Sequence, residues 1–340
     1  MNKTKILGVY KWATMGGVER VLLNRAHAIQ QNNLNIEYHV YFFFDSGGKE
    51  KFNQYLECNN LTDIMKIVDY IDNDYYDYVL SIDTPEIFEF VEPSKLFMEC
   101  HTSYKSNRSY LKTLDSRIKG ILVPSEQFKE ELEEELSEDL RNKLIVISNS
   151  VHVKDSSTKY SKIYNKTPIL YVGRLDKLKN IEELVKIVSS YNSYSDELIL
   201  LLAGPIIEHD INLKETLEKY KMLNRTIYLP PVDFDRVGEL LHFVKKNRGI
   251  FMSASISESY GLSVAEAMKV QLPVLAYDNQ AHYSLLNGDQ TFLFEGENLQ
   301  QAHKKLEYIL SHYDYCSQKI ELYSQSLEHD FTEKWISLFT

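Results

Sequence analysis

The stretch Ser257-Glu258-Ser259-Tyr260-Gly261-Leu262-Ser263-Val264-Ala265-Glu266-Ala267-Met268 contains the most informative pattern in the sequence. An apolar, strand-like run ends before it, a turn with a glycine follows, and a helical pattern begins. The first N–H groups of a helix lack partners inside the helix and favour anions, so the amides of residues 261–263 are predicted to receive phosphate oxygens. Glu258 precedes the helix and can bind hydroxyls, whereas Glu266 lies in the second turn and leans back toward the same place. Alternatively, Glu258 is only a partner of the helix dipole and Glu266 only a solvated or capping side chain.

Short apolar runs alternate with longer amphipathic stretches on both sides of this motif. Such βα alternation is typical of a parallel sheet covered by helices. Strands are predicted at residues 6–10, 37–44, 78–82, 95–99, 120–124, 144–148, 169–172, 198–203, 226–229, 249–253 and 274–277. Helices are predicted at residues 18–30, 182–191, 213–220, 237–246 and 264–269. The polar segment after Val151, up to Thr167, has no periodicity and is the predicted linker between two doubly wound domains.

Length and composition narrow the possible functions. A chain of 340 residues exceeds the usual single core, which also favours two domains. The formal net charge of -11 argues against a generic nucleic-acid binder, which needs basic surface. Three scattered cysteines offer neither a disulfide framework nor a zinc site and fit a reducing compartment, so a cytoplasmic location is expected. No apolar run approaches the ~20 residues that span a bilayer.

Two further motifs follow predicted strands. Leu170-Tyr171-Val172-Gly173-Arg174-Leu175, followed by Lys177 and Lys179, combines a glycine turn with cations before a helix, an arrangement that suits a diphosphate. The same cations could instead form surface ion pairs. Met15-Gly16-Gly17-Val18-Glu19-Arg20 places glycines where backbone can approach a ligand closely, although it lacks the full dinucleotide-binding fingerprint.

Together with Pro273-Val274-Leu275-Ala276, the stretch from Ser257 resembles the signature of the family-4 retaining glycosyltransferases of GT-B fold, the glycosyl transferases group 1. The other two motifs resemble that family's donor-phosphate element and its N-terminal glycine loop. The sequence departs from the family at Ser259 and Gln271, where glycine is common. The resemblance implies an α/β chain of two Rossmann-like domains facing a central cleft. Residues 1–152 are then expected to bind the acceptor, residues 153–328 the donor, and residues 329–340, with a helical pattern at 331–339, to cross back to the first domain.

The resemblance also implies roles for individual residues. Glu258 would bind donor-sugar hydroxyls, Glu266 the ribose, and Arg174 with Lys179 the diphosphate. His101, after the strand at 95–99, would contact the donor sugar beside the reaction centre, although a lone histidine is otherwise a polar surface residue. The residues expected to bind the donor are therefore Gly16, Gly17, Gly173, Arg174, Lys179, Glu258, Tyr260, Gly261, Leu262, Ser263 and Glu266, and those expected to act in catalysis are His101, Arg174, Lys179 and Glu258.

A basic segment with tyrosines follows His101 and contains Tyr104, Lys105, Arg108, Tyr110, Lys112, Arg117 and Lys119. It could face an anionic acceptor or anionic lipid at the inner face of the membrane, or be a solvated helix face. Two Asp-x-Asp strings, Asp72-Asn73-Asp74 and Asp233-Phe234-Asp235, do not suit a metal, and the second is predicted to start a helix. In the GT-B interpretation Arg, Lys and helix amides replace the metal, so no metal and no other cofactor are expected.

The expected reaction is retaining transfer of a hexose or N-acetylhexosamine from a nucleoside diphosphate sugar, with UDP as the expected nucleotide. The expected acceptor is a polysaccharide, another glycan, a glycolipid or a glycoprotein. A GT-B-fold sugar-nucleotide epimerase would share the nucleotide grip without needing an acceptor. A non-catalytic sugar-nucleotide-binding partner of another transferase is the alternative outside enzymes.

Overall fold

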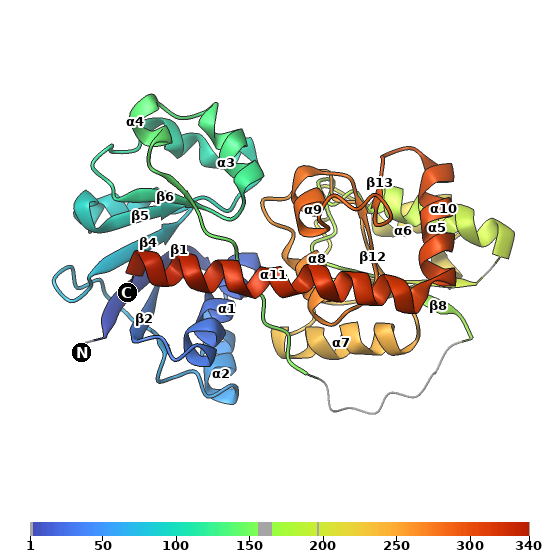
Figure 1. The fold of residues 1–340 in the computed structure, drawn as a ribbon, viewed down its shortest axis with the longest axis horizontal. Coiled ribbons are helices and arrows are strands. Elements are labelled where there is room, and N and C mark those ends of the chain that lie inside the picture. Colours follow the sequence, from blue (N-terminus) through green and yellow to red (C-terminus); the bar gives the residue numbers. More distant parts are fainter. Residues whose placement is uncertain (1–2, 156–164, 196, 340) are drawn as a thin grey trace. The chain divides into compact units, whose positions relative to one another are not determined.

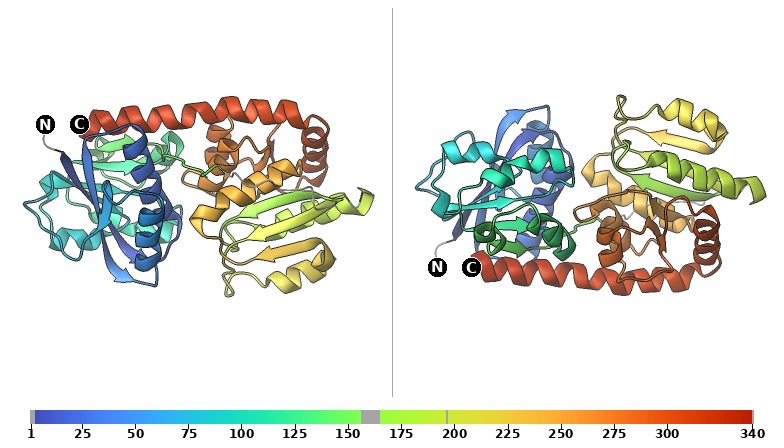
Figure 2. Two further views of the ribbon diagram at one scale, coloured as in Figure 1. Left: turned by 90° about the horizontal axis from the view of Figure 1, so that it is seen from below. Right: turned by 90° about the horizontal axis from the view of Figure 1, so that it is seen from above.

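The computed structural model describes residues 3–155, 165–195 and 197–339, which form two α/β units. The first unit comprises Met1–His152 and Leu327–Thr340, and the second comprises Val153–Ser326. Each unit is a parallel sheet with helices on both faces (Figures 1 and 2). The predicted fold class, two Rossmann-like doubly wound domains, is confirmed. Residues 156–164, the middle of the predicted linker, lie outside the described residues.

The first unit contains a seven-stranded sheet in the order β3-β2-β1-β4-β5-β6-β7, with every pair parallel. The strands are β1 (Thr4–Ala13), β2 (Ile36–Asp45), β3 (Met65–Ile67), β4 (Tyr78–Ile82), β5 (Leu96–Glu99), β6 (Gly120–Val123) and β7 (Leu144–Val146). The α-helices are α1 (Gly17–Gln31), α2 (Lys49–Cys58), α3 (Glu126–Glu133) and α4 (Glu138–Arg141), and 3-10 turns occupy Pro85–Glu89, Pro93–Lys95 and Lys105–Thr113. The strand order reverses between β1 and β4, and ligands of open α/β sheets bind at such a switch point, beyond the carboxyl ends of the strands.

The second unit contains a six-stranded parallel sheet in the order β10-β9-β8-β11-β12-β13. The strands are β8 (Thr167–Val172), β9 (Leu198–Ala203), β10 (Thr226–Leu229), β11 (Ile250–Ser253), β12 (Val274–Tyr277) and β13 (Leu293–Phe294). The helices are α5 (Ile181–Ser195), α6 (Leu213–Lys219), α7 (Phe234–Lys246), α8 (Leu262–Lys269), α9 (Gln280–Leu285) and α10 (Leu299–Ser311), with a 3-10 turn at Leu223–Arg225. The order reverses between β8 and β11, so the loops after these two strands are the expected ligand site.

The last helix, α11 (Tyr313–Phe339), is much longer than the segment that the sequence pattern predicts. Its early residues Tyr313, Cys316 and Ile320 are buried in the second unit, and Phe331 and Trp335 are buried in the first. Because the two halves of the helix bury their apolar side chains in different units, the sequence shows no single continuous periodicity over the helix.

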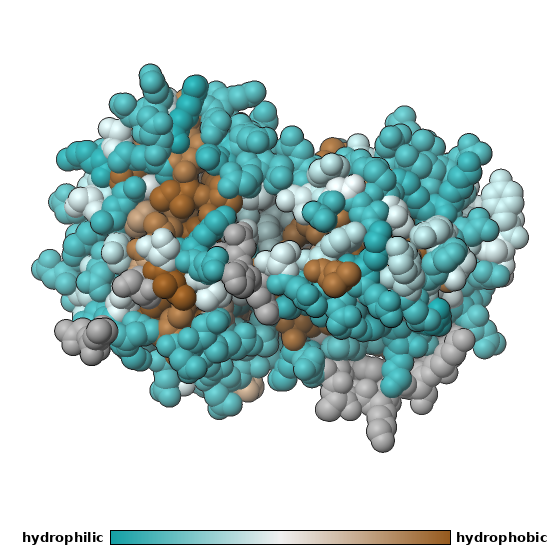
Figure 3. Space-filling model, viewed as in Figure 1, coloured by the Kyte–Doolittle hydropathy of each residue, from teal (hydrophilic) through white to brown (hydrophobic). Residues whose placement is uncertain are grey.

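Apolar side chains fill the space between each sheet and its helices, and nearly all strand residues of both sheets are buried or half-buried. The face in Figure 3 is mostly hydrophilic, with apolar side chains gathered over the region of β5 and β6. Within residues 3–155, 165–195 and 197–339, no helix combines the length and the hydropathy needed to cross a membrane.

Candidate functional site

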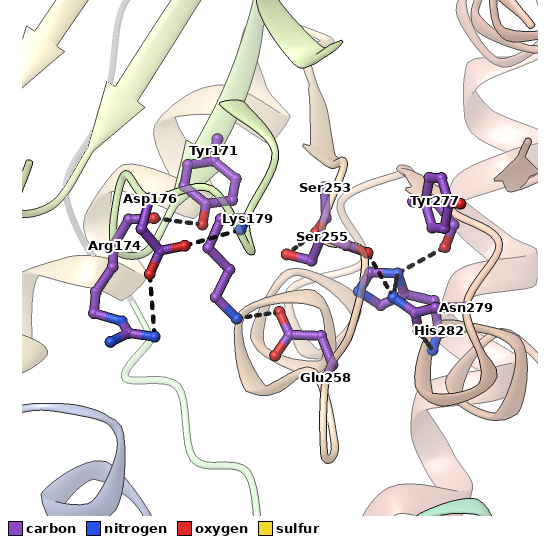
Figure 4. A network of polar contacts seen from close by, with 10 residues as sticks. All are labelled: Tyr171, Arg174, Asp176, Lys179, Ser253, Ser255, Glu258, Tyr277, Asn279 and His282. Atoms are coloured by element: carbon purple, nitrogen blue, oxygen red, sulfur yellow. Dashed lines mark hydrogen bonds and ion pairs between the residues drawn. The ribbon is translucent and has the colours of Figure 1, made fainter. Parts of the chain in front are cut away.

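The loop after β8 brings the predicted phosphate-binding cations to the switch point of the second sheet. Arg174 is half-exposed, and its guanidinium lies 3.2 Å from the buried carboxylate of Asp176. The same carboxylate accepts a hydrogen bond of 2.9 Å from the backbone N–H of Lys179. The backbone carbonyl of Arg174 in turn accepts a hydrogen bond from the Tyr171 hydroxyl. Asp176 therefore fixes the loop that presents both cations (Figure 4).

Lys179 and Glu258, which are far apart in sequence, form an ion pair of 2.6 Å between Nζ and Oε1. Both side chains are mostly buried, with 15% and 16% of their surface exposed. Burial on its own raises the pKa of Glu258, but the charge of Lys179 and the hydrogen bonds from Lys179 and Ser255 act against burial, and the pKa lies below its usual value. The carboxylate is consequently ionised at neutral pH and accepts hydrogen bonds, which suits sugar hydroxyls.

Helix α8 starts beside this ion pair. Its N-cap is Gly261, which has a φ of 89° and makes no side-chain cap hydrogen bond. A left-handed φ favours glycine, and a Cβ on Gly261 would lie 3.1 Å from Leu285 Cδ1. No side chain therefore caps the first amides of α8. Glu266 is buried further along the same helix. This geometry suits an anion at residues 261–263.

The structure explains one departure from the family pattern. Gln271 has a φ of 60°, a left-handed conformation that glycine adopts without strain. Both atoms of the glutamine's side-chain amide have partners: its Oε1 accepts a hydrogen bond from Lys245, and its Nε2 donates one to Glu321. Side-chain hydrogen bonds thereby support a left-handed backbone conformation at a position where the family that the sequence resembles commonly has glycine.

The glycine loop of the first unit differs from the start of α8. Glu19 folds back over the loop and accepts hydrogen bonds from the amides of Thr14, Met15 and Gly16. These donors are therefore occupied by a residue of the protein itself. A Cβ on Gly17 would have no atom within 4 Å, so the backbone at Gly17 is the open part of the loop.

His101 lies after β5 in the first unit, above a buried ion pair. Its Nε2 lies 3.0 Å from Glu99 Oε2, and its backbone N–H donates to Asp83. Glu99 also forms two hydrogen bonds with Arg25, and both partners are almost completely buried. Burial on its own raises the pKa of Glu99, but the charge of Arg25 and its hydrogen bonds lower the pKa to about 2. An ionised Glu99 keeps the proton of the neutral imidazole on Nε2 and leaves Nδ1 as the acceptor.

The basic segment after His101 is not the continuous cationic surface that the sequence suggests. Arg108 is completely buried and pairs with Glu131 at 2.6 Å and Glu135 at 2.8 Å. Arg117 pairs with Asp115 at 2.6 Å. Both predictions for Arg108, a ligand-facing cation and a solvated face, are wrong because its guanidinium is internal and neutralised.

Sequence reasoning missed Asp176, Asn279 and His282. Asp176 stands between the two predicted cations, and this position was a usable signal because a buried carboxylate commonly orients neighbouring basic groups. Asn279 follows β12 and caps α9, where its side chain accepts a hydrogen bond from the backbone of His282. An Asn-x-x-His pattern directly after a strand indicates such a cap, but nothing in the sequence indicates that His282 is completely buried.

Comparison with known proteins agrees with this arrangement. The family model for glycosyl transferases group 1 matches residues 153–322. A sucrose synthase from Melioribacter roseus is 31% identical over 163 residues, which are 43% of this chain and 20% of that protein. The chain therefore spans only about a fifth of that relative.

Two solved structures share the fold over nearly their whole length. A mutant TarM from S. aureus, in complex with fondaparinux, alpha-GlcNAc-glycerol and UDP, has a TM-score of 0.75 at 11% identity, with 100% of both chains covered. HepE from Anabaena, in complex with UDP and glucose, has a TM-score of 0.73 at 15% identity, with 98% of this chain and 100% of that chain covered. The matched family model covers the entire loop-and-helix arrangement around Lys179 and Glu258, and the chain belongs to the glycosyl transferases group 1 family.

Proposed function

We propose that this chain is a retaining glycosyltransferase that transfers a hexose or N-acetylhexosamine from a nucleoside diphosphate sugar, with UDP as the nucleotide. The observation that carries the proposal is the Lys179–Glu258 ion pair beside the uncapped start of α8. It joins a cation, an ionised carboxylate and free helix amides at one switch point. These groups match the anionic phosphates and the hydroxyls of one ligand.

The division of labour follows from the contacts. Arg174 is the half-exposed cation and binds the diphosphate directly, while Lys179 bridges the diphosphate and Glu258. As the glycosidic bond breaks, negative charge grows on the departing diphosphate, and the two cations with the amides of residues 261–263 stabilise it. Glu258 holds the sugar hydroxyls and Glu266 the ribose. No metal is required in this scheme, so activity should persist in EDTA.

The acceptor is proposed to be a glycan, a glycolipid or a glycoprotein that binds to the first unit. Trp12 and Phe44 support this proposal, because their rings stack at a centroid distance of 4.7 Å near the carboxyl ends of β1 and β2. They remain 42% and 50% exposed. An exposed aromatic pair offers a flat apolar surface to the ring of a sugar. The UDP and sugars in the TarM and HepE structures support the same classes of donor and acceptor.

Calorimetric titration of Glu258→Gln and Glu266→Gln with UDP-sugar and with UDP tests the proposal. Glu258→Gln should impair binding of the UDP-sugar and transfer while leaving UDP affinity nearly unchanged, because Glu258 touches the sugar. Glu266→Gln should weaken both ligands through the ribose. Glu215→Gln, an exposed position on α6, is the matched control. If both site variants equalled the parent in binding and in transfer, the two glutamates would be structural and the proposal would fail.

A further inference from the structure

His282 lies beside the proposed sugar site, but its buried ring has no assigned role. It stands in the first turn of α9 and is completely buried. Its Nδ1 lies 2.8 Å from the carbonyl oxygen of Tyr277. Nδ1 also lies 3.0 Å from Asn279 Nδ2, but this amide nitrogen already donates to the carbonyl of Ser255. The carbonyl oxygen of Tyr277 is closer and can only accept a hydrogen bond, so we assign the proton of the neutral ring to Nδ1. Nε2 therefore carries a lone pair and is an acceptor.

Asn279 holds the ring in this orientation. Its Oδ1 accepts a hydrogen bond from the backbone N–H of His282, and its Nδ2 donates to the carbonyl of Ser255. The side chain thus ties the start of α9 to the loop after β11. The imidazole has little freedom to turn, because both its backbone and its Nδ1 are fixed.

The other ring nitrogen points to the Glu258 side of the site. Figure 4 shows Nδ1 turned toward Tyr277 and Asn279, with the rest of the ring on the side of Glu258 and Lys179. A Cβ added to Gly261 would lie 3.4 Å from His282 Cδ2 and 3.7 Å from Nε2, so the glycine before α8 borders this edge of the ring. Within the described part of the chain, Nε2 is a buried atom without a hydrogen-bond partner. Such an atom is costly unless a ligand or water satisfies it.

The ring is neutral near pH 7. Burial lowers the pKa of His282 below its usual value, and Lys179 lowers it further. Glu258, Asp278 and the bond to Tyr277 act in the opposite direction but do not outweigh burial. The site next to α8 therefore contains two acceptors, the ionised Glu258 and the neutral His282.

We propose that His282 Nε2 accepts a hydrogen bond from a hydroxyl of the donor sugar, beside the hydroxyls bound by Glu258. This inference rests on the proposed function, since it concerns the same ligand. An ionised diphosphate has no proton to donate to Nε2, and the ribose hydroxyls are assigned to Glu266, so the hydroxyls of the donor sugar beside Glu258 are the remaining donors. His282 accordingly selects for a hydroxylated sugar and contributes nothing to the affinity for the bare nucleotide.

Calorimetry on two variants separates this role from a structural one. The probes are UDP-glucose, UDP-N-acetylglucosamine and UDP, and the sugar nucleotide that the parent binds more tightly is used throughout. His282→Leu should weaken its binding by roughly three- to tenfold, the loss expected for one hydrogen bond, with UDP affinity unchanged. His282→Gln, whose amide can donate to Tyr277 and accept from the ligand, should recover part of the loss. His209→Leu, at an exposed histidine of the same unit, is the control.

Nitrogen-15 NMR on histidine-labelled parent protein gives a readout that does not depend on how the variants fold. The chain has 10 histidines, and the signal missing from His282→Gln assigns the residue. If that variant does not fold, the signal is assigned through the sequential backbone resonances. Nε2 should be unprotonated in the free protein, and its signal should move toward that of a hydrogen-bonded acceptor when the UDP-sugar is added, but not when UDP is added.

The outcomes distinguish this inference from the proposed function. The role of His282 would be overturned, and the proposed function would stand, if the parent binds the UDP-sugar and His282→Leu loses the same factor of affinity for UDP as for the UDP-sugar. A proton on Nε2 in the free protein would do the same. A parent that binds neither UDP-glucose nor UDP-N-acetylglucosamine would overturn both.

Discussion

Arg174 and Lys179 look equivalent in the sequence but differ in the structure. Lys179 is mostly buried and paired with Glu258, whereas Arg174 is half-exposed and lies 3.2 Å from Asp176. Removing Lys179 would leave Glu258 as an unpaired buried carboxylate, so its variants mix lost binding with disturbed structure. Arg174→Ala tests the proposed diphosphate binding with less disturbance, because Asp176 keeps its hydrogen bond from the backbone N–H of Lys179.

Arg174→Ala should weaken binding of both UDP and UDP-sugar by more than tenfold, because a cation paired with phosphate typically contributes ~2–5 kcal/mol. The melting temperature should change little, since the side chain is half-exposed. Calorimetric titration measures the affinities, and Arg236→Ala, which removes an exposed arginine from α7, is the control. Unchanged affinity for both ligands would show that Arg174 belongs to a surface ion pair.

The lowered pKa of Glu99 predicts that the stability of the first unit depends on pH. Its pKa in the folded protein is about 2, below the ordinary value of about 4.3 in an unfolded chain. A lowered pKa contributes stability above the unfolded value, and this contribution is lost as the pH falls from about 4.3 toward 2.

Glu99→Gln should therefore lower the free energy of unfolding by about 3–5 kcal/mol at pH 7, because it leaves the buried Arg25 without its ionic partner. The difference from the parent should shrink between pH 5 and pH 3. Denaturant unfolding at a series of pH values measures it, with the exposed Glu92→Gln as control. A difference that stays constant over this range would contradict the lowered pKa.

At the scale of elements, the helices α1 and α8, which follow the two predicted glycine turns, start in different ways. Helix α1 is preceded by a loop whose amides are already bound by Glu19, while α8 starts at Gly261 without a capping side chain. The open helix start lies in the unit that the family model covers. The glycine loop of the first unit is then a rigid, internally capped turn, and only its Gly17 end is open to a ligand.

Glu19→Ala should destabilise the first unit by about 1–3 kcal/mol, because three backbone donors lose their acceptor. The loss follows from the structure whether or not a ligand binds there. Urea unfolding monitored by tryptophan fluorescence reports on the first unit, and Glu57→Ala, an exposed position on α2, serves as control. Equal midpoints for parent and variant would mean that water replaces the carboxylate without cost.

At the scale of the whole molecule, α11 belongs to both units, since its residues from Leu327 onward group with the first. Trp335 is completely buried in the first unit. Its ring stacks against that of Phe331 with 5.1 Å between the ring centroids, and the guanidinium carbon of Arg25 lies 4.9 Å from the centroid of the Trp335 ring. The only two tryptophans, Trp12 and Trp335, both lie in the first unit, so their fluorescence reports on that unit alone.

Phe331→Ala should lower the free energy of unfolding of the first unit by about 3–5 kcal/mol, as expected for the loss of a large buried side chain. The midpoint of unfolding detected by fluorescence should fall accordingly. The part of the far-UV circular dichroism transition that belongs to the second unit should keep its midpoint, because two-domain proteins do not have to unfold in one step. Leu322→Ala, an exposed position on the same helix, is the control. A variant with the parent's fluorescence midpoint would show that this end of α11 adds no stability to the first unit.

The sequence by itself determined the fold class and most of the sheet. The strands predicted at 78–82, 198–203, 226–229 and 274–277 coincide with β4, β9, β10 and β12, because local runs of apolar residues produce them. It did not reveal β3 and β13, which have three and two residues and therefore no period to detect. The length of α11 was missed as well, since its buried positions serve two separate cores.

The sequence also identified the residue types around the proposed donor site, because a glycine turn, two cations and two carboxylates stand close to predicted strand ends. Only the tertiary structure decided how they pair. Lys179 forms an ion pair with Glu258, and Arg174 forms one with Asp176. Glu19 accepts hydrogen bonds from the amides of the glycine loop, and Arg108 is buried. The same holds for the burial of His282 beside Gly261. The physical reason is that charge pairing and desolvation depend on distances between residues far apart in the chain, which local sequence patterns do not encode.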